Sequence, residues 1–359
     1  MRSPHTLRKW LRTLLPTAGE AALAAGWWLV WAWVAAYTTQ LCQIARQCGR
    51  PYTARTCRQY LTRWLAAEQW EPDALYAGLA REVRRRLRRQ RQVPLLVDFT
   101  YLGRRWAVLQ VSLGWQHRAL PVYRAVYHRR EPELKQTAAV QAACEWLRAH
   151  LPGPPGRYVL VMDRGFPGHR LLNWLTAQSW RYVVRVSGKW RMQHARYTGL
   201  LREAAAAGVP VGPVPRLFRQ ARWGRLGKGR DEWSETNVVF YHGVGGRAPW
   251  YLLTSLGRAG RAVHVYRQRM QIEQEFRDLK GPFGLDHLAT WRERERVARL
   301  LAWTAVYEWW LARLWEAHQL ERWGAQFRVS GPLSWIRITR EWLHWQVFHP
   351  PRNQRLAWL

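Results

Sequence analysis

The chain has 359 residues, of which 48% are hydrophobic, so it can bury the cores of two or three domains and disorder is not expected. Lys and Arg number 57 against 24 Asp and Glu, which gives a formal net charge of +33. This charge attracts polyanions and makes nucleic acid the first candidate partner. The four Cys form no C-x-x-C pair and have no His at finger-like spacing, which argues against a zinc site and favours reduced thiols in a cytosolic protein.

Residues 1–90 are predicted to form a helical DNA-binding domain. Within them, residues 21–37 are almost uniformly apolar. They only just reach the length of a membrane span and contain four Trp, so a buried helix is favoured over a membrane-associated protein. The basic residues 1–15 lack the apolar core and cleavage site of a secretion signal, so we expect a cytoplasmic protein that associates with the nucleoid.

Residues 38–65 form a helix, a short break at 49–51 and a second helix, which is compatible with a helix-turn-helix. Many helical hairpins have the same pattern, so a hairpin without contact to DNA is the alternative. The basic run 81–91 is either a phosphate-binding segment or a solvated helix end. The residues that the second helix would present to DNA are Arg55, Arg58, Gln59 and Arg63.

The pattern changes from helical to extended after Pro94. Three apolar runs separated by polar breaks predict a strand meander, and a helix, a strand, a helix and another strand follow. The order βββαβαβ matches the ribonuclease-H-like fold, a mixed α/β sheet that presents carboxylates from strand ends and from a later helix. The segments are 93–102, 105–115, 119–128, 133–150, 158–163, 171–178 and 181–186.

The rest of the chain divides into three parts. Residues 188–256 are rich in Gly and Arg, contain strand-like runs and predict a β-rich insertion. Residues 257–285 predict a return to the core on a helix. Residues 286–359 are Trp-rich and predicted to be largely helical, and we expect contacts of a homodimer there. The first part of the core would then span residues 91–187.

Tyr266, Arg269, Glu273 and Lys280 follow the pattern Y-(2)-R-(3)-E-(6)-K. At about 100° per residue the four positions fall within roughly 60° of one another on one helix, beside an apolar stripe. Gly281 and Pro282 would end this helix. For a single Glu, an exposed charged stripe would be the simplest interpretation, but the fourfold match favours a functional pattern.

This pattern resembles the signature of DDE transposases of the insertion-sequence-four group, the relatives of the Tn-five and Tn-ten transposases. The resemblance covers roughly residues 94–287. It implies that Glu273 is the third catalytic carboxylate and that Asp98 and Asp163 are the first two. Both Asp lie in or after apolar strand-like runs, where an ionised carboxylate should be paired, protonated or bound to metal. A strand-end Asp that caps a turn is the alternative for each alone.

The resemblance also implies two Mg²⁺ or Mn²⁺ ions per active site, held by Asp98, Asp163 and Glu273, with Asp98 bridging them. Tyr266, Arg269 and Lys280 would contact the phosphates of the transposon end. Arg164 follows the second Asp, and Asp163 to Phe166 resembles the family's sequence there.

Trp250 occupies the position of a family Trp that stacks on a flipped base, although a core Trp at a strand edge would fit equally well. The expected function is a cut-and-paste DNA transposase that binds terminal inverted repeats and joins the ends to target DNA as a homodimer. The alternatives are a metal-dependent nuclease or resolvase without strand transfer, and a catalytically silent DNA-binding protein descended from a transposase.

Overall fold

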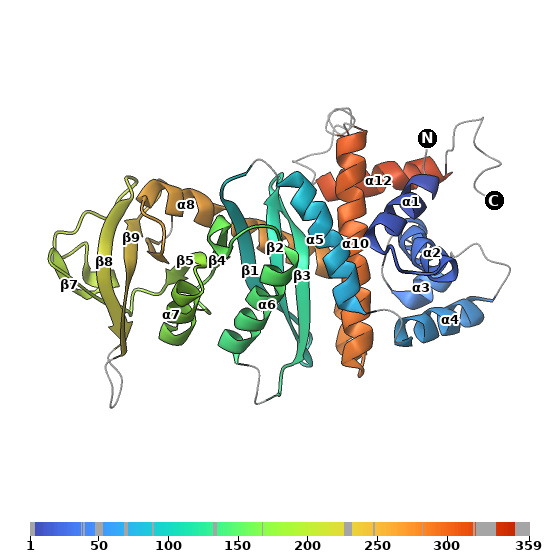
Figure 1. Cartoon of the computed structure of the whole chain (residues 1–359), viewed down its shortest axis with the longest axis horizontal. Helices are drawn as coiled ribbons and strands as arrows, with labels where there is room; N and C mark the ends of the chain where they lie inside the picture. The colour runs from blue at the N-terminus through green and yellow to red at the C-terminus, as the bar shows by residue number, and fades with distance from the viewer. Residues whose placement is uncertain are drawn as a thin grey trace.

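The computed structural model describes residues 4–36, 38, 40–46, 53–67, 71–87, 90–131, 135–166, 168–225, 232–246, 248–281, 283–318, 320 and 335–348. Along the long axis of the molecule, Figure 1 shows strands β7 to β9 (residues 197–241) at one end and the central sheet in the middle. Helices α1 to α4 (residues 4–66) lie at the other end, beyond α10 (Arg294–Ala317) (Figure 1). The carboxylates predicted from the sequence belong to the middle part.

The strands form one ten-stranded sheet in the order β3-β2-β1-β4-β5-β10-β9-β8-β6-β7. The first three strands are antiparallel, and β1, β4 and β5 are parallel. The strands are β1 (Val93–Leu102), β2 (Trp106–Trp115), β3 (Arg118–His128), β4 (Tyr158–Met162), β5 (Arg181–Val186), β6 (Arg191–His194), β7 (Tyr197–Leu200), β8 (Arg216–Arg225), β9 (Glu232–Tyr241) and β10 (Trp250–Thr254).

Helices cover both faces of the central sheet, which is the part of the ten-stranded sheet formed by β1 to β5 and β10 (Figure 1). Helices α1 to α4 form a helical unit beyond its β3 edge (Figure 1). The α-helices are α1 (Pro4–Leu14), α2 (Glu20–Ala36), α3 (Leu41–Arg46), α4 (Ala54–Ala66), α5 (Pro72–Arg86), α6 (Gln136–His150), α7 (His169–Ala177), α8 (Ala259–Arg267), α9 (Met270–Lys280), α10 (Arg294–Ala317) and α12 (Trp335–Phe348). Short 3₁₀ helices are η1 (Pro155–Arg157), η2 (Leu201–Glu203) and η3 (Leu285–Thr290).

The predicted fold class is confirmed, because the mixed sheet has the strand directions and flanking helices of a ribonuclease-H-like core. Strand β1 explains how both faces are covered, since successive side chains of a strand point to opposite faces. Leu95 and Val97 lie in the core cluster that includes α6 and α7 residues, whereas Leu96 lies in the cluster that includes α8 and α9 residues. By the same alternation, Asp98 lies on the face covered by α8 and α9.

The apolar segment 21–37 corresponds to α2, which is buried among the other helices, with Leu29 and Trp33 almost inaccessible. Gly26 permits close packing of α2 on α10, because a Cβ there would lie 2.1 Å from the ring of Trp303. No helix in the described parts of the chain is long and apolar enough to cross a membrane. The prediction of a buried helix is confirmed by the burial of Leu29 and Trp33 among the other helices.

Two details differ from the prediction, and a third lies outside the described residues. The helix expected over 133–150 begins at Gln136 in the described residues. The helix-turn-helix segment contains α3 and α4, but its predicted break at 49–51 lies outside the described residues. Strands β6 to β9, from the predicted insertion, continue the central sheet beyond β10, which pairs directly with β5. The domain limits themselves stay predictions.

Candidate active site

Asp98 and Asp163 are brought together by the pairing of β1 with β4. The two strands are parallel, and Val97 pairs with Met162, so the next residues along both strands are neighbours at the same level of the sheet. The side chain of Asp98 is 19% exposed and that of Asp163 is 28% exposed. Asp98 lies within β1 and Asp163 directly after β4, and the register of the two strands places them side by side.

Glu273 approaches the two Asp from α9, which follows a turn rather than continuing α8. The backbone N–H groups of Gln268 and Arg269 donate to the carbonyls three residues earlier, at Val265 and Tyr266. The expectation of one unbroken helix from Tyr266 to Lys280 is thus wrong, because these tighter bonds end α8 at Arg267 before α9 begins at Met270.

The guanidinium of Arg269 lies among all three carboxylates. Its Nη1 is 3.0 Å from Oδ2 of Asp98, and its Nη2 is 3.7 Å from Oδ2 of Asp163 and also forms an ion pair with Glu273. The Arg269 side chain is only 8% exposed, less than any of the three acids. Asp98, Asp163 and Glu273 therefore converge on one buried positive charge.

Two further contacts fix the orientation of the Asp side chains. The backbone N–H of Phe99 donates to Oδ1 of Asp98 at 2.8 Å, and the buried hydroxyl of Tyr266 donates to Oδ1 of Asp163 at 3.2 Å. Trp250 packs edge-on against Tyr266, with ring centroids 5.0 Å apart. Tyr266 therefore touches the carboxylate cluster, and Trp250 supports Tyr266 from the neighbouring strand.

Burial controls the ionisation of this cluster. It raises the pKa of Asp98 to about 6, and Arg269 only partly opposes the effect. Burial also raises the pKa of the Tyr266 hydroxyl, and the negative charge of Asp163 adds to this. Burial opposes the charge of Arg269, but the surrounding carboxylates outweigh it and raise the guanidinium pKa. Tyr266 is thus a hydrogen-bond donor, and Arg269 is a permanent cation.

The donor set fits hard divalent cations, because three carboxylates from three different elements surround a position that already accommodates positive charge. The guanidinium of Arg269 is that charge in this structure. Among the described residues, no three acidic, His or Cys side chains are arranged so that they could hold a metal directly. A metal held by these three carboxylates would lie where the guanidinium of Arg269 lies in this structure.

Arg164 follows Asp163 directly, and Lys280 lies on α9 with Glu273, but neither side chain makes a polar contact with the three carboxylates in the described part of the chain. Lys280 is half-buried at the end of α9 and lines a small cavity with Thr100 and Phe276. Arg164 is exposed in the turn after Asp163. Among the described residues, no hydrogen bond or ion pair connects either side chain to the three carboxylates.

The four candidates on α4 are all exposed, as predicted for Arg55, Arg58, Gln59 and Arg63. Arg58 lines a cleft of about 520 Å³ between the helical unit and the segment before α10. Arg292 and Arg296 line the same cleft from that segment and from α10. The sequence did not single out these two arginines, because they follow Arg58 by 234 and 238 residues and Arg is common throughout the chain.

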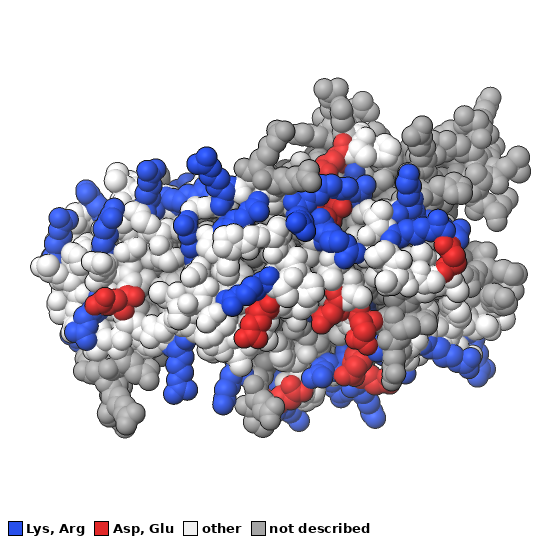
Figure 2. Space-filling view, viewed as in Figure 1, with Lys and Arg blue, Asp and Glu red and all other residues white. Residues whose placement is uncertain are grey.

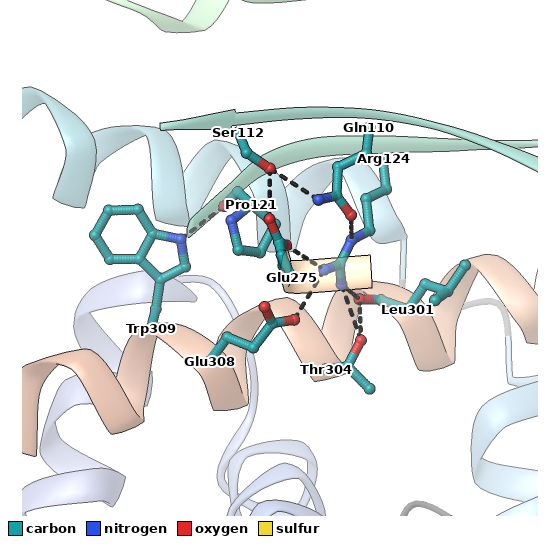
Figure 3. A network of polar contacts seen from close by, with 9 residues as sticks. All are labelled: Gln110, Ser112, Pro121, Arg124, Glu275, Leu301, Thr304, Glu308 and Trp309. Carbon is teal, nitrogen blue, oxygen red and sulfur yellow. Dashed lines mark hydrogen bonds and ion pairs between the residues drawn. The ribbon is translucent and has the colours of Figure 1, made fainter. Parts of the chain in front are cut away.

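A buried polar network beside the cluster was also not anticipated. In Figure 3 the guanidinium of Arg124, on β3, lies between Glu275 of α9 and Glu308 of α10, and all three side chains are fully buried. Burial, together with the charge of Glu308, raises the pKa of Glu275 well above its ordinary value. The only sequence signal was polar residues, Gln110 and Ser112, within an otherwise apolar strand.

A family model described as "Transposase DDE domain" matches residues 82–309, from the C-terminal turns of α5 into α10. The matched range contains all three carboxylates and the whole turn between α8 and α9. No curated protein matches the chain.

Proposed function

The chain belongs to the transposase DDE domain family, and we propose that it is a cut-and-paste DNA transposase of the insertion-sequence-four group. In this proposal it binds the terminal inverted repeats of its element, cleaves DNA there and joins the ends to target DNA as a homodimer. The observation that carries the proposal is the convergence of Asp98, Asp163 and Glu273, from β1, the end of β4 and α9, on a single cationic position.

The proposed role of Asp98, Asp163 and Glu273 is to hold two Mg²⁺ or Mn²⁺ ions. When bound, such ions stabilise negative charge on the attacking and leaving oxygens of a phosphodiester. The chain itself supplies orientation: Phe99 and Tyr266 hold one oxygen of each Asp in a fixed direction. The other oxygen, Oδ2 in both residues, faces Arg269.

Arg269 and Tyr266 are proposed to contact DNA phosphates beside the scissile bond. Arg269 has the geometry for this role once cations replace it among the carboxylates, since its guanidinium can pair with a phosphate in the same fork-like manner. Lys280 and Arg164 would then reach phosphates farther along the DNA. Trp250 is proposed to stack on an unpaired base, with Tyr266 supporting its ring.

The charge distribution supports DNA as the partner. Figure 2 shows Lys and Arg at many separate places on a mostly uncharged visible face, and Asp and Glu at fewer places. Two adjoining clefts at the amino ends of β1 and β5 share Gln92 and Arg261, and their lining includes Arg91, Arg181 and Arg258 but no acidic residue. Exposed Arg55, Arg58, Gln59 and Arg63 on α4 are proposed to contact the inverted repeat. A cytoplasmic location would give access to the nucleoid.

The test is cleavage of the DNA that flanks this reading frame, with Mg²⁺ or Mn²⁺, by the wild type and by Glu273→Gln. The amide keeps the shape of the side chain but is a poorer ligand, so we expect binding of the ends to persist and cleavage to fall by at least a hundredfold. Glu295→Gln is the matched control, because Glu295 is exposed at the start of α10.

Three other results would redirect the proposal. Cleavage without joined target products would indicate a nuclease or resolvase. Binding of the ends without cleavage by the wild type would indicate a silent DNA-binding protein. Equal cleavage by wild type and Glu273→Gln would remove Glu273 from the proposed site.

A further inference from the structure

Asp98 and the buried Arg124 belong to one row of side chains across three strands. Asp98 pairs with Gln110 across β1 and β2, and Gln110 pairs with Arg124 across β2 and β3. Directly opposed residues of neighbouring strands project from the same face of a sheet. The row therefore begins in the carboxylate cluster and ends in the buried polar network, and both ends face α9.

Helix α9 crosses this row and contributes one Glu to each end. Glu273 pairs with Arg269 beside Asp98, whereas Glu275 pairs with Arg124. Residues two apart on a helix are separated by about 200°, so the two Glu lie on opposite flanks of α9. The helix consequently lies over the middle strand, β2, with one flank toward β1 and the other toward β3, both of which it contacts.

Glu275 is held by the sheet at both carboxylate oxygens. Nη2 of Arg124 lies 2.9 Å from Oε1, and the hydroxyl of Ser112 donates to Oε2 at 3.0 Å. Gln110 links the two donors, since its amide nitrogen donates to the Ser112 hydroxyl and its oxygen accepts from Arg124. Glu275 has no exposed surface and therefore has little freedom to move.

Arg124 is itself held in place from the other side by α10. Its Nη1 donates to the carbonyl of Leu301 and to the hydroxyl of Thr304, both at 3.0 Å. Its Nη2 lies 2.8 Å from Glu308 (Figure 3). Five residues from β2, α9 and α10 thus fix one guanidinium, and that guanidinium fixes the flank of α9 opposite Glu273.

Stability alone is a poor reason for such a network. Removing charges from water is costly, and well-packed hydrophobic residues of similar volume usually stabilise a core at least as well as a buried ion pair. Charged hydrogen bonds differ from apolar contacts in having direction, so they specify the rotation of a helix about its axis. On α9 that rotation determines whether Glu273 faces Asp98 and Asp163.

We propose that Arg124 and Glu275 are positioning residues that set the rotation of α9 and so keep Glu273 beside Asp98 and Asp163. The inference rests on the proposed function, because it takes Glu273 to be a metal ligand. In this arrangement Glu275 contacts neither metal nor DNA and acts only through the backbone of α9.

The test compares Glu275→Gln with Glu308→Gln. Both Glu are fully buried, and both pair with Nη2 of Arg124, but only Glu275 lies on α9. The measurements are the thermal midpoint of unfolding and the Mn²⁺ dissociation constant of the DNA-free protein, obtained from the electron paramagnetic resonance signal of free Mn²⁺. A readout that does not need cleavage separates metal binding from catalysis.

We expect both variants to lower the thermal midpoint, but only Glu275→Gln to weaken Mn²⁺ binding, by about tenfold or more, as is typical when groups that orient metal ligands are changed. Equal Mn²⁺ affinity in both variants and the wild type would overturn the inference, because the network would then be purely structural. Equally weakened Mn²⁺ binding in Glu275→Gln and Glu308→Gln would also overturn it, because the effect would then not depend on a residue of α9.

If Glu275→Gln does not fold, Ser112→Ala replaces it in the Mn²⁺-binding test. It removes the hydrogen bond to Oε2 of Glu275 and the acceptor of the Gln110 amide, and it leaves Arg124, Glu275 and Glu308 unchanged. We expect Mn²⁺ affinity to fall severalfold with this variant and to stay unchanged with Ser234→Ala, which alters another buried Ser on β9. Unchanged affinity in Ser112→Ala would contradict the inference.

Two other outcomes would instead contradict the proposed function. One is that the wild type binds no Mn²⁺, and the other is that Glu273→Gln binds Mn²⁺ as tightly as the wild type does. If Glu273→Gln abolishes binding while Glu275→Gln and Ser112→Ala do not weaken it, only the positioning role of the network fails.

Discussion

The guanidinium of Arg269 lies 3.0 Å from the carboxylate of Asp98, although 171 residues separate them in the chain. Because Arg269 also pairs with Asp163 and Glu273, it neutralises acids that would otherwise repel one another. It is also the residue proposed to contact phosphate during catalysis. In the proposed function, Asp98, Asp163 and Glu273 would hold cations where the guanidinium now lies, and Arg269 would be available to pair with a DNA phosphate.

Arg269→Met is expected to destabilise the metal-free protein by about 3 kcal/mol, because three carboxylates lose their buried partner. Added Mn²⁺ should restore much of the lost stability, since it supplies positive charge at the same position. Thermal unfolding with chelator and with Mn²⁺ measures both effects. Arg277→Met, at an exposed position of α9, is the control. A variant as stable as the wild type in chelator would contradict this prediction.

His287 is expected to make stability depend on pH. Burial lowers its pKa below the ordinary value of 6.5, and its Nδ1 lies 2.6 Å from the carbonyl of Gly284, to which the neutral ring can donate. Below pH 6.5 the unfolded chain therefore binds a proton that the folded chain resists, so this contribution to stability is complete above pH 6.5 and is lost as the pH falls.

The corresponding variant is His287→Asn, which keeps a side-chain N–H for Gly284 but does not titrate. Urea unfolding at pH 5 and pH 7 should show a smaller difference in free energy of unfolding for this variant than for the wild type. Gln116→Asn, which changes a residue that does not titrate in an exposed turn, should keep the full difference. If His287→Asn also keeps the full difference, His287 is not the group responsible.

The cleft lined by Arg58, Arg292 and Arg296 is expected to contact DNA phosphates. Each phosphate contact that an Arg→Ala change removes should lower the slope of log affinity against log salt by about one. Fluorescence anisotropy of labelled terminal DNA at several salt concentrations measures this slope. Arg148→Ala, on the exposed surface of α6, is the control, and identical slopes in all variants would exclude the cleft.

Trp250→Ala tests base stacking. Loss of one stacked base should weaken binding of a terminal DNA with an unpaired base by about 1–3 kcal/mol, while fully paired DNA binds as before. The measurement is the fluorescence of 2-aminopurine at the unpaired position, which a stacked Trp quenches. If Trp250 is only a core residue packed on Tyr266 and Tyr241, the thermal midpoint falls and the quenching persists.

The approach of Asp98 to Asp163 could be predicted from the sequence, since each occupies the same place in its apolar strand and the parallel pairing of β1 with β4 follows from the element order. The break between α8 and α9 could not, because periodicity is nearly unchanged across a short turn whose backbone stays in the helical region. The partners of Arg124 could not be predicted either, because they lie up to 184 residues from it in the chain. Only the packing of α9 and α10 on the sheet brings them together with Arg124.

The pairing of β10 with β5 has a further consequence for the chain between them. The chain leaves the central sheet after Val186 and returns at Trp250 in the adjacent position, so its exit and its return are one strand spacing apart. Strands β6 to β9 are therefore a side branch that starts and ends at the same place. A change confined to β6 and β7 therefore leaves β10 paired with β5, because it is β9 that pairs with β10 and contacts α7 and α8.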